Sequence, residues 1–171
     1  MSRNPAPGGC LKHPALLGAL FVLVLNDHLL KRACPGFLTG KLSDFAGVLL
    51  LPLFLHALCE LFWAHVRHRP LSVPQGNRVL LACVVVALTM FALPEVWKPA
   101  ELAYRYGMGG LRWPFQALYA WLTASVTPAL QPVRATADVT DLMALPMGFV
   151  AYRVGRRGGR ATSQLSPVSE A

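Results

Sequence analysis

Charged residues are scarce in this chain. Only 14% of its 171 residues are Asp, Glu, Lys or Arg, whereas about a quarter are charged in soluble domains. Hydrophobic residues make up 54%, and the mean hydropathy is +0.45. The apolar residues run in blocks and lack the two-residue alternation of membrane β-barrels. The composition therefore predicts an all-α, polytopic membrane helix bundle.

Several signatures of catalysis and metal binding are also missing. The four cysteines form no C-x-x-C pair, which removes the usual zinc and redox spacings. The sequence has no G-x-S-x-G, no H-E-x-x-H and no phosphate-binding loop, and "YGMGGLRW" (residues 106–113) suggests a flexible turn. We expect no cofactor. The net charge is +8, but the basic residues are not interleaved with aromatic residues as they are in proteins that bind single-stranded nucleic acid. No nucleic acid partner is therefore expected.

Four apolar blocks predict four transmembrane helices, because about 20 apolar residues cross the hydrocarbon core. The predicted spans are about 14–30, 42–66, 79–97 and 139–154. They form one transmembrane domain, 14–154, between a cytoplasmic segment, 1–13, and a disordered cytoplasmic tail, 155–171. An interfacial helix is expected at about 113–127, since Pro114 and Pro128 bracket too short a stretch for a span. A fifth span there is the alternative.

The arginine distribution predicts the orientation. Compact basic clusters at Arg67–Arg69 and Arg153–Arg160 lie at span ends, where the positive-inside rule counts most. We therefore predict a multi-pass protein of the bacterial inner (plasma) membrane with both termini in the cytoplasm. The lipid bilayer is its expected partner, with anionic headgroups at these clusters. Protein partners are unknown.

Short first and fourth blocks draw polar residues towards the bilayer. The run from Ala15 to Leu25 is about 16 Å of helix, so the first span must include Asn26, Asp27 and His28 to cross. The fourth block, from Leu142 to Val154, is also too short to cross, so its span must include the residues just before Leu142. "TGKLSDFAG" (39–47) and "TADVTDLMA" (136–144) match in hydroxyl and aspartate positions, which suggests two hairpins of one design.

The predicted topology brings one set of polar residues to the outer membrane face. The candidate polar cluster is Asn26, Asp27, His28, Lys41, Ser43, Asp44, Asp138, Thr140 and Asp141. Ionisable groups at membrane depth are costly and mark ion or solute pathways. The leading hypothesis is binding or passage of a cation, a proton or a small polar solute.

Two other interpretations of the cluster remain open. In an accessory or structural membrane protein, the Ser-Asp and Thr-Asp pairs would only cap helices and form ion pairs, for example Lys41 with Asp44 or Asp138. In a membrane-embedded enzyme, Asp27 and His28 would supply a base or hold a metal. The enzyme is the less favoured of these two interpretations. Separately, His56 and Glu60 are four residues apart, so they share a helix face.

The first third of the chain resembles a group of uncharacterised small multi-pass membrane proteins of bacteria. The resemblance rests on N-D-H-x-L-K, here Asn26 to Lys31, followed by T-G-K-L-S-D-F-x-G, here Thr39 to Gly47. It implies no assigned activity. It implies that Asp27, His28, Lys41 and Asp44 act as one unit.

Overall fold

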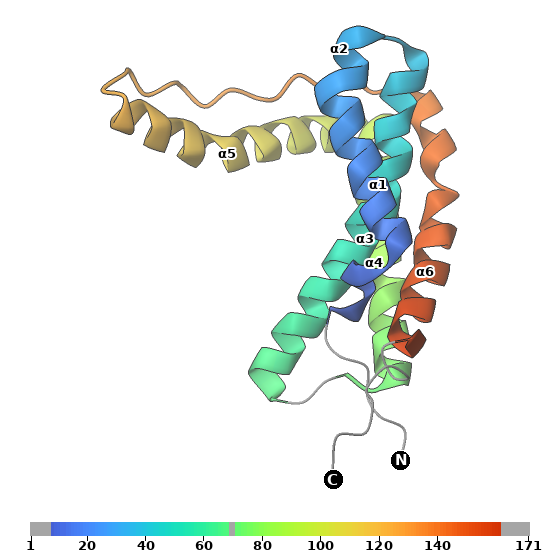
Figure 1. The fold of residues 1–171 in the computed structure, drawn as a ribbon. Helices are drawn as coiled ribbons and strands as arrows, with labels where there is room; N and C mark the ends of the chain where they lie inside the picture. The colour runs from blue at the N-terminus through green and yellow to red at the C-terminus, as the bar shows by residue number, and fades with distance from the viewer. Residues whose placement is uncertain (1–7, 69–70, 162–171) are drawn as a thin grey trace. The chain divides into compact units, whose positions relative to one another are not determined.

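The computed structural model describes residues 8–68 and 71–161, and these residues contain helices and no strand, as predicted. The α-helices are α1 (Pro14–Leu25), α2 (Lys31–Ala33), α3 (Phe37–Arg67), α4 (Val73–Val96), α5 (Lys98–Leu122) and α6 (Met147–Ala161). A π-helical turn, η2 (Asn26–Leu30), joins α1 to α2. Two 3-10 helices are η1 (Gly9–Lys12) and η3 (Val139–Ala144). Figure 1 shows the path of the chain.

The chain divides into two compact units, residues 1–89 with 143–171 and residues 90–142. In the first unit, α3 packs against both α1 and α6 (Figure 1). Four helices supply two buried residues each to one apolar core. These residues are Leu16, Ala19, Leu49, Leu53, Leu80, Val84, Ala151 and Val154. The core thus joins α1, α3, α4 and α6.

Three helices are long and apolar enough to cross a membrane: Pro14–Ala33, which combines α1, η2 and α2, then α3 and α4. Large apolar side chains such as Phe21, Phe62 and Val85 point outward on them. A helix that is apolar around its whole circumference is typical of a membrane span. These features fit a membrane protein. In the described part of the chain α6 has 15 residues and is not among the three, so the four-span count is not confirmed.

Helix boundaries differ from the predicted spans where polar residues extend a helix. The α3 helix begins at Phe37 rather than 42, since Thr39 Oγ1 accepts the Gly36 N–H (3.1 Å) and completes the first turn. The α4 helix begins at Val73 rather than 79, and Pro74 is tolerated in its first turn. The α6 helix continues to Ala161, into the predicted tail. Residues 1–7 and 162–171 lie outside the described residues.

The second unit contains the α5 helix and an extended return segment, residues 125–138. The helix is longer than the expected interfacial helix at its start and ends earlier, at Leu122. It runs through the glycine-rich stretch 106–113, where a flexible turn was expected, and through Pro114. Ala124, with φ of +50°, ends it, and the Ser125 N–H donates to the Ala120 carbonyl (2.8 Å). This is a Schellman ending, and the chain then runs back along α5 (Figure 1).

Three hydrogen bonds hold the return segment to α5. The Val133 N–H donates to the Arg105 carbonyl (3.0 Å), and Arg105 Nε donates to the Val133 carbonyl (3.1 Å). Trp113 Nε1 donates to the Pro128 carbonyl (2.9 Å). A Cβ at Gly109 would clash with the carbonyl oxygen of Gln131, so glycine permits this close approach. The return segment is therefore held to α5 at Pro128 and at Val133.

Candidate functional site

Asn26 is the most deeply buried polar residue of the predicted cluster, with none of its surface exposed. It is the first residue of the π-helical turn, in which the Lys31 N–H donates to the carbonyl five residues earlier, that of Asn26. A π-turn adds one residue to a helix and changes the direction of the side chains that follow. Asn26 is buried, whereas Asp27 and His28 in the same turn are exposed.

A chain of hydrogen bonds links this turn to α3. Asn26 Nδ2 donates to the Thr39 carbonyl (2.6 Å) and to Ser43 Oγ (2.7 Å), and Ser43 Oγ donates to Asp27 Oδ1 (2.7 Å). The carbonyl of Thr39 can only accept, which fixes the orientation of the Asn26 amide. We call Asn26, Asp27, Thr39 and Ser43 the polar junction. It joins the first two candidate spans.

One atom of the polar junction is left unsatisfied. Asn26 Oδ1 is buried and has no hydrogen-bond partner among the described residues. A buried acceptor without a donor costs about 1–3 kcal/mol. The atom is therefore suited to a group that carries a donor or a positive charge.

The outer edge of the polar junction is a surface ion pair. Lys31 Nζ lies 2.7 Å from Asp27 Oδ1, and both side chains are more than 40% exposed. Exposed pairs of this kind contribute about 0–1 kcal/mol. A competing cation therefore needs little energy to replace Lys31 at the carboxylate.

Three other residues of the predicted cluster lie near the polar junction in sequence. Lys41 is buried, and its ammonium lies 5.1 Å from the centre of the Phe37 ring. Asp44 is half-buried on α3, and His28 is exposed on η2. Among the described residues no hydrogen bond joins His28 to Asp27, and their role as a base or as metal ligands stays a prediction.

Helix capping does not explain Ser43 and Asp44. Because α3 begins at Phe37, both residues lie in its second turn and not at its N-cap. The capping interpretation is therefore wrong for this copy of the motif. Gly36 and Thr39 perform the role instead.

The second copy of the motif has a different local structure. Asp138 Oδ1 accepts from the Thr140 N–H (2.9 Å) and the Thr140 hydroxyl (2.7 Å), which caps η3. The Asp138 N–H in turn donates to a carboxylate oxygen of Glu95 (2.6 Å). Thr140 and Asp141 thus lie within a 3-10 turn rather than a long helix. Asp138 and Thr140 belong to the second unit, and their convergence with Asp27 and Asp44 stays a prediction.

The His56–Glu60 pair on α3 is formed as the sequence spacing suggests. His56 Nε2 lies 3.6 Å from Glu60 Oε1 and 3.2 Å from the Gly76 carbonyl, and the Gly8 N–H donates to Glu60 Oε2 (2.8 Å). A cavity of about 30 Å³ beside the pair has room for about one water molecule. The pair links α3 to α4 and to the segment before η1.

The described residues contain no group of three or more His, Cys, Asp or Glu side chains that would suit a metal ion. The ligand set of the polar junction is instead an amide, a hydroxyl, a backbone carbonyl and one carboxylate. No family model matches the chain, and no curated protein or solved structure is significantly similar to it. The function is therefore inferred from the chemistry of the polar junction alone.

Two groups at the polar junction were not predicted from the sequence. The predicted cluster lacks the Thr39 carbonyl and Lys31. Lys31 nevertheless lies in the N-D-H-x-L-K motif, and Thr39 lies in the T-G-K-L-S-D motif. Lys31 follows Asp27 by four residues, which is the spacing of a helical ion pair, so a helix continuing past Leu30 would have revealed it.

Proposed function

We propose that this multi-pass membrane protein binds a small cation, or a small solute that donates hydrogen bonds, at the polar junction. The observation that carries the proposal is Asn26 Oδ1, a buried acceptor without a partner among the described residues, inside a candidate span. Asp27 supplies negative charge beside it. A divalent metal is disfavoured because only one carboxylate takes part.

Binding would proceed by exchange at the exposed edge. The incoming cation takes the place of the Lys31 ammonium at Asp27 and is then coordinated by carboxylate and amide oxygens. Ser43 fixes the Asp27 carboxylate through its hydroxyl (2.7 Å). Loss of the ion pair costs little, because both partners are solvated.

The test is a thermal shift of the purified protein in detergent, at constant ionic strength, with Na⁺, K⁺, NH₄⁺ or Mg²⁺ replacing N-methylglucamine. We expect a small monovalent cation at tenfold its Kd to raise the Tm by about 2–5 °C. Asp27→Asn should abolish this shift, and Lys31→Gln should lower the Kd because it removes the competing ammonium. Glu101→Gln, in the second unit, is the matched control and should leave the shift unchanged.

Two results would contradict the proposal. One is a wild-type protein whose Tm responds to none of these cations. The other is an Asp27→Asn variant that keeps the full response. Either result would favour the structural alternative, in which the polar junction only ties α1 to α3.

We also propose that both termini are cytoplasmic and that the basic clusters contact anionic headgroups of the inner membrane. Arginines at the end of α3 and in the middle of α6 lie over aromatic rings four residues earlier: Arg67 over Trp63 and Arg153 over Phe149, at 5.2 and 5.1 Å. Aromatic and basic residues together are typical of a membrane–water interface.

This orientation predicts the labelling of Cys34, which is exposed at the end of α2. In a Cys10→Ser background, a membrane-impermeant maleimide applied to spheroplasts should label Cys34, and Cys34→Ser should lose the signal. Labelling that occurs only after the membrane is opened would reverse the proposed orientation.

A further inference from the structure

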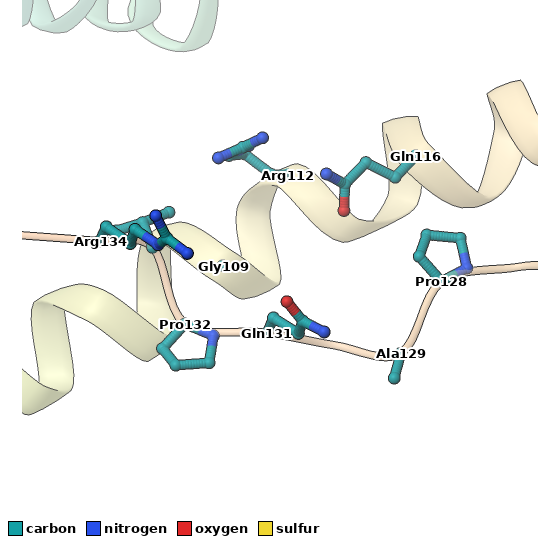
Figure 2. A pocket seen from close by; sticks show the side chains of 9 residues that line it. Gly109, Arg112, Gln116, Pro128, Ala129, Gln131, Pro132 and Arg134 are labelled. Atoms are coloured by element: carbon teal, nitrogen blue, oxygen red, sulfur yellow. The ribbon is translucent and has the colours of Figure 1, made fainter.

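A polar pocket lies between α5 and the return segment, far in sequence from the polar junction. Its volume is about 460 Å³, and it is lined by Gly109, Arg112, Gln116 and residues 128–129 and 131–134. Figure 2 shows Arg112 and Gln116 on the helix, with Gln131 and Arg134 on the segment that passes it. Two guanidinium groups and two amides thus surround one space.

Within the part of the chain that the structure describes, no acidic group neutralises the charges at this pocket. Arg112 and Arg134 make no hydrogen bond or ion pair within residues 8–68 and 71–161, and no acidic residue lines the pocket. Arg105, by contrast, is held by Glu101 (3.4 Å) and the Val133 carbonyl. The Lys98 ammonium, 2.6 Å from Glu101, lowers the pKa of that carboxyl group below its ordinary value. Glu101 is therefore ionised and engaged with its own two cations.

The walls of the pocket are fixed before any ligand arrives. The Arg105–Val133 hydrogen bonds lie at one end and the Trp113–Pro128 hydrogen bond at the other. Gly109 allows the two backbones to approach between these points. A preformed site loses little conformational entropy on binding.

A second, more apolar groove adjoins the pocket and shares Arg112, Gln116 and Pro128 with it. Its volume is about 500 Å³, and it continues along Phe115, Tyr119 and Val126. Phe115 is 71% exposed and Tyr119 is 69% exposed. The combined site has a cationic end and an aromatic end, so it fits an amphipathic anion better than a free phosphate ion.

We propose that this combined site binds one anionic phospholipid. The phosphate lies between Arg112 and Arg134, whose planar guanidinium groups match phosphate oxygens. An acyl chain follows the groove past Phe115 and Tyr119. The lipid bilayer is available to α5 because only Trp97 separates it from α4, a candidate span, while its four charged residues disfavour a span for α5 itself.

The experiment measures binding of dioleoyl phosphatidylglycerol to the full-length protein in a neutral detergent, with phosphatidylcholine, glycerol phosphate and inorganic phosphate as comparison ligands. We expect saturable phosphatidylglycerol binding, about tenfold weaker or worse in Arg112→Gln/Arg134→Gln. The control Arg32→Gln/Arg78→Gln removes the same charge from exposed positions on α2 and α4, outside the pocket and both basic clusters, and should change the Kd less than twofold. Phe115→Ala/Tyr119→Ala should weaken phosphatidylglycerol binding alone.

Three outcomes would overturn the proposal. Equal binding of phosphatidylcholine would remove the role of charge, and equal losses in both arginine double variants would show non-specific attraction. Binding of inorganic phosphate as tight as that of the lipid would make this a site for free phosphate. Asp27→Asn should retain lipid binding, so failure here and failure of the cation proposal are distinguishable.

Discussion

Replacing Asn26 by aspartate should lower the Tm of the protein by about 6–12 °C, although the two side chains are nearly equal in size. The substitution puts an oxygen where Nδ2 now donates to the Thr39 carbonyl and Ser43 Oγ. Two hydrogen bonds are lost, and a buried oxygen then faces the carbonyl oxygen. At about 1–3 kcal/mol for each buried group left unsatisfied, the cost is about 3 kcal/mol. The Tm is measured by thermal unfolding in detergent, followed by circular dichroism. In a chain of this size, each kcal/mol of lost stability lowers the Tm by about 2–4 °C.

Ser43→Ala is the comparison, since it removes the hydrogen bond from Asn26 Nδ2 and the one to Asp27 Oδ1 without adding an acceptor. It should cost about 1 kcal/mol. A Tm for Asn26→Asp within 2 °C of wild type would mean that the amide does not donate to Thr39. The orientation of Asn26, and with it the unsatisfied Oδ1, would then be wrong.

Gly155→Val should destabilise the first unit by about 1–3 kcal/mol, which is the usual cost of overpacking a core. A Cβ at Gly155 would lie 2.7–2.8 Å from the methyl carbons of Leu80 and 3.1 Å from Leu53 Cδ2. Both leucines are completely or almost completely buried, so neither has room to move away. The valine would therefore push α6 away from α3 and α4.

The matched control is Gly47→Val in α3, because nothing lies within 4 Å of a Cβ built there. The helix propensities of the two substitutions are the same, so the difference in Tm between the two variants isolates the packing term. An equal Tm for Gly155→Val and Gly47→Val would contradict the close packing of α6 in this core.

The apolar blocks were sufficient to predict the helices of the described residues and that several are long and apolar enough to cross a membrane, since block length and hydropathy depend on local sequence alone. Helix starts were predicted less well. Thr39 and Gly36 begin α3 through one side-chain contact, and a polar first turn of this kind is not part of the apolar pattern. Similarly, glycines and charges near Arg105 and Arg112 concealed α5 within what looked like a loop.

The candidate site was predicted in part, because the motifs named Asn26, Asp27 and Ser43 but not the contacts among them. Apolar periodicity assumes a regular α-helix, so it does not indicate the π-turn that begins at Asn26. The meeting of Asp44 with Asp141 requires the arrangement of two separate units and remains a prediction.

The π-turn at Asn26–Leu30 also has a consequence for the first span as a whole. One additional residue in a helix shifts the angular phase of everything beyond it by about 100°. Positions before Asn26 and positions after Leu30 therefore follow two different helical registers within one continuous segment of 20 residues. Deleting one residue of the turn would merge the two registers and rotate the residues from Lys31 onward by about 100° relative to Leu16 and Ala19 in the core.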